Sequence, residues 1–405
     1  MPSLRVLIAG AALRASTAYE PFGVAPTAVD CSFAASYPRQ YVAYHLENAT
    51  LGALTGDLSK PAWAAVAFTD SFVDIATPTA PQFRTRAKIR WDDAFLYVAA
   101  DVEDEVAWAN ITSTCHCVDP AHDQVIFHDN DFEIFVDADG STHAYKEYEM
   151  NCLNATWDLS LNKPYDDGGS ENSSRVFGPA GWDYPPPIGG PRSMHAGAFV
   201  RGVPNNPAAP ARGWTVEVAL PLASLAENTT AAVPPAPGSF WRINFSRVEW
   251  AVKVVDGGYQ KFPSCQSCAA PGSNAEDDWV WSPMGSVAMH LPEKWGFLQF
   301  ARGAVNATPA VVNGEWPVRA HAAALYYAEH AFAAAHNGSF TARAADLAPY
   351  VADAALLDGS CSGGAPLSLA LVGSGFVATV PPSPFGNQAA RATITNDRLL
   401  RVETG

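Results

Sequence analysis

Short runs of alternating apolar and polar residues, separated by turns rich in Gly, Pro and Asp, recur through most of this chain. Residues 84–91 alternate, Asp92-Asp93 supplies a turn, and residues 94–102 predict the second strand of a hairpin. The other predicted strands lie at residues 62–69, 131–137, 145–153, 198–203, 214–220, 240–250, 279–281 and 295–300. Since helical periodicity is almost absent here, the pattern predicts a mainly β fold, a β-sandwich over residues 55–302.

The last hundred residues have a different pattern. Residues 316–335 are rich in Ala with aromatics at helical spacing, and Asn337-Gly338 is a stop signal, which predicts a helix. A second helix is predicted at 341–356, and two small hairpins at 368–380 and 390–402. We therefore expect a small α+β appendage over residues 303–405.

The N-terminus predicts a secreted protein. Arg5 precedes a short apolar run at residues 6–13, and Ser16-Thr17-Ala18 gives a small-residue cleavage pattern, so residues 1–18 are interpreted as a signal peptide. The apolar run is too short to span a bilayer. Residues 19–54 carry few periodic signals and are interpreted as an N-terminal extension.

Sequons for N-glycosylation agree with secretion into the extracellular space or a secretory lumen. Chance would give roughly two N-x-S/T patterns in such a chain, and eight are present. Asn244 falls in a predicted strand, where a glycan is hard to place. The seven remaining candidates are Asn48, Asn110, Asn154, Asn172, Asn228, Asn306 and Asn337.

Charge limits the partners that the chain can bind. The formal net charge is −16. Nucleic acids and anionic membranes need a basic surface, so both are excluded as expected partners. The acidic balance suits neutral or cationic ligands and calcium.

The seven cysteines allow up to three disulfides with one thiol left over. They stand at positions 31, 115, 117, 152, 265, 268 and 361. A zinc site is an alternative for the cluster Cys115, His116, Cys117, His122 and His128, although its spacing matches no standard zinc pattern.

One stretch places an acidic residue inside an apolar strand. Residues 128–139, HDNDFEIFVDAD, place Glu133 inside an otherwise apolar strand between two Asp-rich turns. At the edge of a sheet such a carboxylate is ordinary. On a concave face it would hold a hydroxylated ligand.

Several blocks resemble a known family when they are taken in order. The blocks are DNDFEIFVDADGSTHAYKEYEMNCLNATWDLSLNKPYDDGG, GWTVEVALPLASL, FWRINFSRVEW and DDWVWSPMGSVAMHLPEKWGFLQF. Together they are similar to carbohydrate-binding module family 9-like domains over roughly residues 55–302. The resemblance implies a lectin-like β-sandwich that binds a polysaccharide or oligosaccharide and holds structural calcium.

The resemblance also implies a set of sugar contacts. The family's two aromatic walls fall on Phe127 and Met289, with Trp281 close to the latter in sequence, and its strand carboxylate falls on Glu133. Its polar pair falls on Glu149 and Asn151, where Glu149 replaces a basic residue. From the residues themselves, Trp157 is a further aromatic candidate, and the alternative is that these aromatics belong to the core.

Two Asp-rich turns are candidates for calcium. Asp129 with Asp131, and Asp137 with Asp139, offer oxygen ligands at short spacing. Capping of the turns themselves is the alternative interpretation.

Two other functions stay open at this point. Glu147 and Glu149 lie two residues apart on one predicted strand face, with Glu133 expected beside them, which is compatible with a hydrolase acting on O-glycosyl bonds in carbohydrate catabolism. An extracellular adhesion or heme-type binding sandwich is the other alternative. A non-catalytic sugar-binding protein is the main prediction, because the resemblance covers a binding module.

Overall fold

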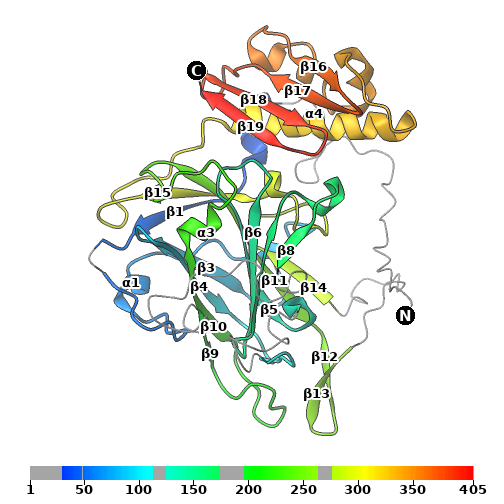
Figure 1. Ribbon diagram of the computed structural model, residues 1–405. Coiled ribbons are helices and arrows are strands. Elements are labelled where there is room, and N and C mark those ends of the chain that lie inside the picture. Colours follow the sequence, from blue (N-terminus) through cyan, green and yellow to red (C-terminus); the bar gives the residue numbers. More distant parts are fainter. Residues whose placement is uncertain (1–29, 48, 113–124, 174–195, 263–275, 405) are drawn as a thin grey trace. The chain divides into compact units, whose positions relative to one another are not determined.

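A computed structural model describes residues 30–47, 49–112, 125–173, 196–262 and 276–404 of the chain. It contains two compact units (Figure 1). The larger unit runs from Tyr37 to Asn313, and the smaller one combines Gly314–Gly405 with Met1–Ser36, of which residues 30–36 are described. The larger unit therefore includes part of the segment that the sequence analysis assigned to an N-terminal extension.

Most strands of the larger unit form a single curled sheet. Its order is β8-β7-β6-β5-β11-β15-β1-β3-β4-β10-β9, and β14 pairs with both β11 and β2. The strands are β1 (Gln40–His45), β2 (Val73–Asp74), β3 (Thr85–Trp91), β4 (Phe95–Val102), β5 (Asp131–Asp137), β6 (Tyr145–Asn151), β7 (Thr156–Leu161), β8 (Glu171–Ser173), β9 (Ala196–Val200), β10 (Trp214–Pro221), β11 (Phe240–Trp250), β14 (Glu276–Val280) and β15 (Gly296–Ala301). A separate hairpin joins β12 (Val252–Val255) to β13 (Gly258–Lys261).

The main hydrophobic core lies on one face of this sheet, and alternation along β5 shows why. Phe132, Ile134 and Val136 all belong to the main core cluster. Successive side chains of a strand point to opposite faces, so Asp131, Glu133 and Phe135 are left on the other face. The polar positions of β5 are therefore gathered on the face that the main core does not use.

Strong alternation predicted the strands well. The expected hairpin at residues 84–102 is β3 and β4, and the strand expected at 131–137 is β5 with the same bounds. The short helical turn expected after the strand at 214–220 is α3 (Leu222–Leu225). The prediction of a mainly β fold is confirmed.

The strand predicted at residues 62–69 is wrong. Pro61–Ala64 forms a helical turn, α1, with Pro61 in the first helical position, where its fixed backbone angle is favourable. The Trp63 indole donates a hydrogen bond of 2.7 Å to the buried Glu217 carboxylate. This contact with a distant strand is invisible to local alternation. The sequence also gave no signal for β1, which pairs in parallel with β15 and β3.

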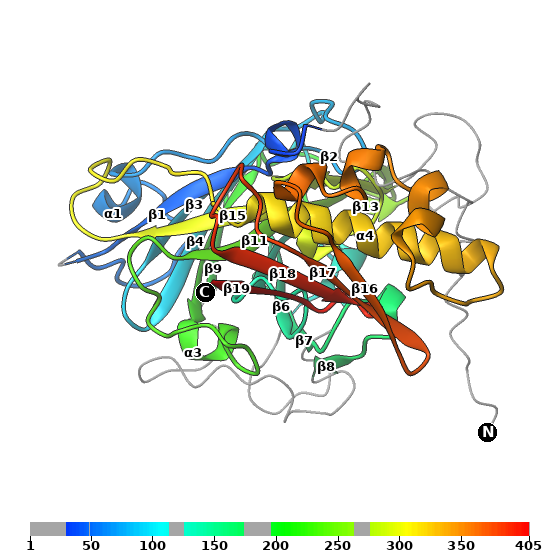
Figure 2. The ribbon, with the colours of Figure 1, turned by 90° about the horizontal axis from the view of Figure 1, so that it is seen from above.

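The smaller unit is α+β, as predicted. Helix α4 (Trp316–Ala335) lies along a four-stranded antiparallel sheet of β16 (Ser368–Val372), β17 (Gly375–Val380), β18 (Ala390–Thr395) and β19 (Leu400–Thr404) (Figure 2). Apolar side chains of the helix and the sheet share a core.

The second helix predicted for this unit, at residues 341–356, is wrong. Two 3₁₀ segments, Ala344–Tyr350 and Ala354–Leu356, replace it. Pro349 removes a backbone donor, and the Asp353 side chain accepts from the Ala355 amide at the start of the second segment, so one continuous α-helix cannot form.

One disulfide, Cys31–Cys361, joins the two chain segments of the smaller unit, and Cys152 is a buried free thiol. The other four cysteines, and with them the zinc-type cluster except His128, lie outside the described residues. Within the described residues, no helix has both the length and the hydropathy that crossing a membrane would require.

Candidate functional site

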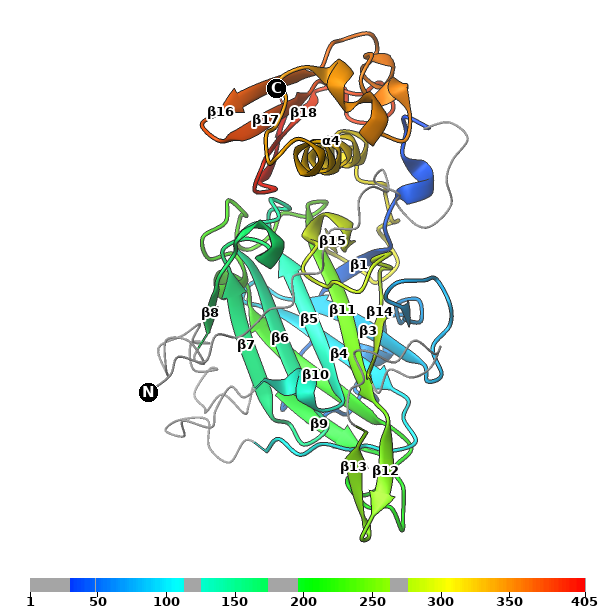
Figure 3. The same cartoon turned by 90° about the vertical axis from the view of Figure 1, so that its right-hand side faces the viewer.

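Strands β7, β6, β5, β11 and β14 are neighbours in the sheet (Figure 3). They present a row of side chains on the face opposite the main core. The antiparallel register places Trp157 opposite Glu149, Glu149 opposite Glu133, and Glu133 opposite Ser246. Directly paired residues point to the same face, so these four side chains lie side by side across the sheet.

This row forms the floor of a cavity of about 440 Å³. The walls come from 3₁₀ turn η2 (Ile126–His128), from the segment around Tyr165 and from residues 287–290. The acidic side chains that line it are Glu133, Glu147, Glu149, Glu171, Glu276 and Asp278. Among the described residues, no Lys or Arg lines this cavity. Its chemistry is therefore strongly acidic.

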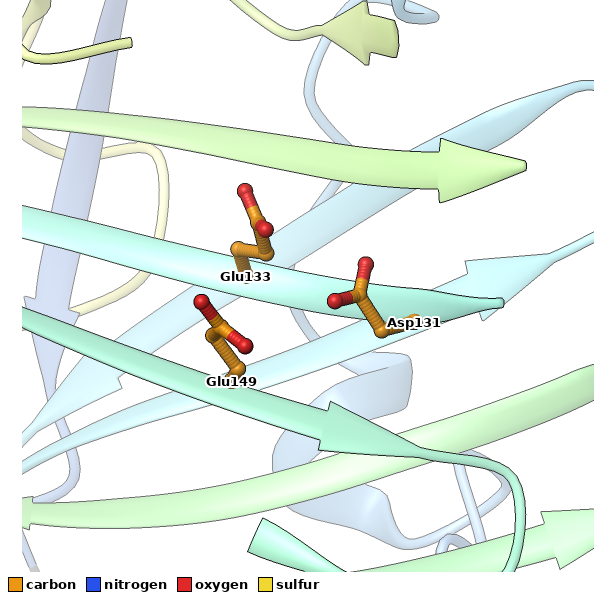
Figure 4. Close-up of side chains that lie close together, drawn as sticks. All are labelled: Asp131, Glu133 and Glu149. Atoms are coloured by element: carbon orange, nitrogen blue, oxygen red, sulfur yellow. The ribbon is translucent and has the colours of Figure 1, made fainter. Parts of the chain in front are cut away.

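Three buried carboxylates lie closest together at the floor. One oxygen from each of Asp131, Glu133 and Glu149 lies within 4.8 Å of the others. Figure 4 shows the three side chains rising from adjacent strands to the same side of the sheet. We call this set the acid triad.

Backbone amides hold two members of the acid triad in place. The Val248 amide donates to Asp131 Oδ1 at 3.0 Å, and the Phe127 amide donates to Glu149 Oε2 at 3.0 Å. Asp131 Oδ2 is buried without a hydrogen-bond partner among the described residues.

Burial raises the pKa of Asp131, Glu133 and Glu149 well above that of free carboxyl groups, and the neighbouring carboxylates raise it further. Burial also raises the pKa of Glu147 to about 7 and that of Asp278 to about 7. The site therefore gathers acids that hold protons near neutral pH unless a cation compensates their charge.

Apolar side chains complete the walls of the cavity. Phe127 and Met289 are partly buried there, while Trp157 is only 4% exposed. Tyr165 is 38% exposed, and its hydroxyl donates to Glu171 Oε2 at 2.8 Å. Its ring packs edge-on against His290 with ring centroids 4.7 Å apart. The cavity thus has apolar rings beside carboxylates.

A second cavity adjoins the first. It measures about 720 Å³ and shares Phe127, His128 and Glu276 with the first cavity. Trp250 and Lys261 line it as well, with the Lys261 ammonium 3.6 Å from the centre of the Trp250 ring. The two cavities therefore form adjacent compartments on one side of the larger unit.

Comparison with known families finds one similarity in the part of the chain that carries this site. Residues 56–236 match the family model described as carbohydrate family 9 binding domain-like. This segment is therefore similar to that family of carbohydrate-binding domains. The matched segment contains the acid triad, Trp157 and Tyr165, whereas Ser246, Asp278 and Met289 lie beyond it.

Solved structures that match this chain have low sequence identity to it. A "putative carbohydrate-binding protein" from Bacteroides uniformis ATCC 8492 is 14% identical with a TM-score of 0.41, and the match covers 65% of this chain and 99% of that one. A carbohydrate binding module family 9 from Caldicellulosiruptor kristjanssonii in complex with glucose is 14% identical with a TM-score of 0.34, covering 67% and 100%. The same module in complex with cellotriose is 13% identical with a TM-score of 0.33, and that match covers 67% of this chain and 99% of the other. No curated protein matches the sequence.

Four of the six predicted sugar contacts meet at one place in the larger unit. Phe127, Glu133, Glu149 and Trp157 all line the first cavity. Met289, where the resemblance placed the second wall, lines it too.

The structure does not bring the other two predicted contacts to the cavity. Both Asn151 side-chain atoms are engaged locally, because Nδ2 donates to Ile111 O and Asp129 while Oδ1 accepts from the Leu153 and Ala155 amides. Trp281 is 1% exposed and belongs to the main core, on the opposite side of the sheet.

The acids predicted to bind calcium in the turns are used mainly as caps. Asp129 Oδ2 accepts from the Asn110 and Ile111 amides. Asp137 accepts from the amides of Ser141 and Thr142, and Asp139 accepts from the amide and hydroxyl of Thr230. Among the described residues, the group of carboxylates within ligand range is the acid triad, to which only Asp131 of the four belongs.

Among the cavity residues that sequence reasoning missed are the polar side chains of Tyr165, Glu171, Glu276, Asp278 and His290. Tyr165 ends the WDLSLNKPY stretch of the sequence blocks that resemble the family, so that resemblance could have pointed to Tyr165 as a site residue. Burial lowers the pKa of His290 to about 4, and its Nδ1 lies 3.0 Å from the Tyr145 hydroxyl. No local pattern predicts that residues 276–290 return to β5 and β6, because that pairing depends on β11.

Proposed function

We propose that the larger unit binds carbohydrate without catalysis, in the first cavity. The observation that supports this proposal most directly is that apolar rings and carboxylates meet in one cavity of about 440 Å³. A sugar ring has an apolar C–H face and an edge of hydroxyl groups, so it needs both kinds of surface.

Each wall has a separate task in this proposal. Tyr165, Phe127 and Met289 pack against the C–H face of the sugar and contribute burial. The carboxylates of Glu133 and Glu149 accept hydrogen bonds from hydroxyl groups and set the orientation of the ring. Glu149 stands where the resembling family has a basic residue, so the preferred sugar differs from that of family members with a cation there.

The preferred ligand in this proposal is an oligosaccharide or the end of a polysaccharide. The second cavity supports this choice, because it shares Phe127, His128 and Glu276 with the first. A sugar chain that leaves the first cavity would pass over those residues and reach Trp250, whose ring lies under the Lys261 ammonium.

Secretion and N-glycosylation belong to the same proposal. Asn110, Asn228, Asn306 and Asn337 are exposed, as a glycan requires. Residues 1–18, predicted to be a signal peptide, and Asn48 lie outside the described residues.

A glycan array tests the proposal. The full chain is probed with neutral, amino and acidic glycans, with calcium and with chelator, and soluble products are assayed for released reducing sugar. We expect selective binding without release of sugar, and a loss of signal in Glu133→Gln. The matched control is Phe199→Ala, because Phe199 is 56% exposed but lies outside the cavity.

Hydrolysis of O-glycosyl bonds is a second candidate, favoured by one observation. Glu147 lines the cavity with a pKa of about 7, which is suitable for a general acid near neutral pH. Release of reducing sugar that disappears in Glu149→Gln would replace the binding proposal with this one. If neither binding nor release is found, an adhesion or heme-type function is the remaining alternative.

A further inference from the structure

We propose that the second cavity binds an acidic sugar unit, one that carries a carboxylate or a sulfate ester, and that Lys261 is its main charged contact. The inference rests on the proposed function and deepens it, because it names the chemical class of the sugar that lies beyond the first cavity. The residues that carry it belong to the end of β11 and to the β12–β13 hairpin.

The hairpin builds most of the second cavity. It follows β11 in the chain and projects beyond the end of the curled sheet (Figure 1). Lys253, Gln260 and Lys261 of the hairpin line the cavity, together with Phe262 just after it and Trp250 at the end of β11. Partly buried apolar side chains of the hairpin pack against the Trp250 cluster, so the hairpin holds its polar residues beside that ring.

The second cavity offers positive charge, which the first does not. Lys253 and Lys261 line it, whereas among the described residues no Lys or Arg lines the first cavity. Within the part of the chain that the structure describes, the lysine that forms an ion pair is Lys60, with Glu217. The chain has a formal net charge of −16, yet no described carboxylate lies within ion-pair distance of the two lysines of the cavity. They are therefore available to an anionic ligand.

The ammonium group of Lys261 is held in a fixed place. Its Nζ donates to His128 O at 2.8 Å and lies 3.6 Å from the centre of the Trp250 ring. Trp250 Nε1 donates in turn to Phe127 O at 2.8 Å, which fixes the ring. An ammonium group has three N–H donors, and His128 O takes one of them. Lys261 thus keeps donors for a ligand in the cavity.

The carboxylates near Lys261 compensate only part of its charge. Burial lowers the pKa of Lys261, and this effect outweighs Asp129 and Glu276, which raise it. An anionic group close to the ammonium would supply the missing compensation. Glu276 lies in the wall that the two cavities share, so the favourable place for an anion is the hairpin side of the second cavity.

An acidic sugar needs an aromatic surface and a cation side by side. The cavity has this combination twice, since the Lys253 ammonium lies 5.5 Å from the centre of the Phe262 ring, much as Lys261 lies over Trp250. The rings suit the apolar C–H face of a sugar, and an ammonium donates charge-assisted hydrogen bonds to a carboxylate or sulfate. The Gln260 amide offers a donor and an acceptor to hydroxyl groups.

Matched pairs of trisaccharides test the inference by calorimetry on the full chain. The pairs are a galacturonate with its methyl ester, a glucuronate with its methyl ester, and a 6-O-sulfated sugar with its unsulfated parent, so that carboxylate and sulfate are distinguished. We expect the wild type to bind the acidic member of at least one pair about fivefold more tightly or better at about 20 mM NaCl. The preference should shrink at about 300 mM NaCl, because salt screens the attraction.

Lys261→Gln should bring the ratio of the two affinities close to one, and Lys253→Gln should reduce it. Arg401→Gln is the matched control, because it also removes one positive charge but lies exposed in the smaller unit, outside both cavities. It should keep the preference. Thermal melts establish which variants fold, and Lys253 is exposed, so Lys253→Gln provides a second folded variant.

The outcomes separate this inference from the proposal on which it rests. Neutral members that bind as tightly as acidic ones would overturn the inference and leave carbohydrate binding in place. A preference that survives in both lysine variants, or that Arg401→Gln abolishes equally, would also overturn it. If no member of any pair binds and the glycan array is silent as well, carbohydrate binding itself fails, and the inference fails with it.

Discussion

Glu133 on β5 lies directly opposite Glu149 on β6, and an oxygen of each lies within 4.8 Å of the other. Two carboxylates in this relationship on a buried face repel each other, and burial adds to the cost of ionising both. The residues around them decide how that cost is met. The raised pKa values of the pair keep protons on these acids near neutral pH, and the ring side chains beside them make the location a cavity suited to sugar.

The stability of the protein should fall as pH rises from about 4.5 through about 7. Burial raises the pKa of Glu147 from the usual 4.5 to about 7. Because the folded pKa is the higher one, the stability linked to this proton is fully present below pH 4.5 and is lost as pH rises through 7. The loss is about 3 kcal/mol by pH 8 or above.

Thermal and denaturant unfolding of wild type and Glu147→Gln between pH 4.5 and 8.5, with chelator present, measures this effect. Glu147→Gln should flatten the decline and should be more stable than the wild type at the alkaline end. Equal slopes for the two proteins would contradict the assignment to Glu147.

Replacing Glu217 should destabilise the larger unit strongly. This fully buried carboxylate accepts from the amides of Thr55 and Gly56, from Trp63 Nε1 and from Lys60 Nζ at 2.6 Å. Glu217→Ala leaves several buried donors and a partly buried ammonium without a partner, so we expect a loss of about 3–5 kcal/mol in chemical denaturation. Glu249→Ala is not a suitable control, since Glu249 pairs with buried Arg247. Glu105→Ala is a suitable control, because Glu105 is exposed, and it should leave the unfolding free energy nearly unchanged.

The disulfide should matter mainly to the smaller unit. Cys31 and Cys361 both belong to it, and the bond ties residues 30–36 to the rest of that unit. The double variant Cys31→Ser, Cys361→Ser should lower its unfolding free energy by about 2–4 kcal/mol. Hydrogen exchange followed by mass spectrometry reports the two units separately. Equal loss of protection in β5 and in α4 would show that the units do not unfold independently.

Glycosylation should follow exposure rather than the sequon alone. In protein secreted from eukaryotic cells, we expect glycans at Asn110, Asn228, Asn306 and Asn337, which are exposed. Asn244 is 0% exposed and its Nδ2 donates to Ser282 O, so its peptide should be unmodified. Peptide mass spectrometry after enzymatic deglycosylation measures this, and a glycan on Asn244 would contradict the placement of β11.

Strong alternation is what made the fold predictable. In β5 the bulky residues Phe132, Ile134 and Val136 alternate with Asp131 and Glu133, so both the bounds and the two faces could be predicted from the sequence. Residues 62–69 failed because a tertiary contact, Trp63 with Glu217, overrides a local preference for strand.

The site was only partly predictable for a related reason. Glu133, Glu149 and Trp157 follow from the sequence, because three consecutive strands pair in order. Trp281 was wrongly assigned to the cavity, because alternation shows which residues share a face of the sheet but not which face packs against the main core. Tyr165 and Asp278 reach the cavity from a turn and from a strand paired only with β11 and β2. Such long-range placement has no local signal.

Titration calorimetry with the strongest array glycan tests the central claim most directly. Wild type, Glu133→Gln and Tyr165→Ala are compared with Phe199→Ala, whose exposed ring lies outside the cavity. We predict at least about a tenfold loss of affinity in each cavity variant, corresponding to about 1.4 kcal/mol, and no change in Phe199→Ala. Unchanged affinity in both cavity variants would contradict carbohydrate binding at this site.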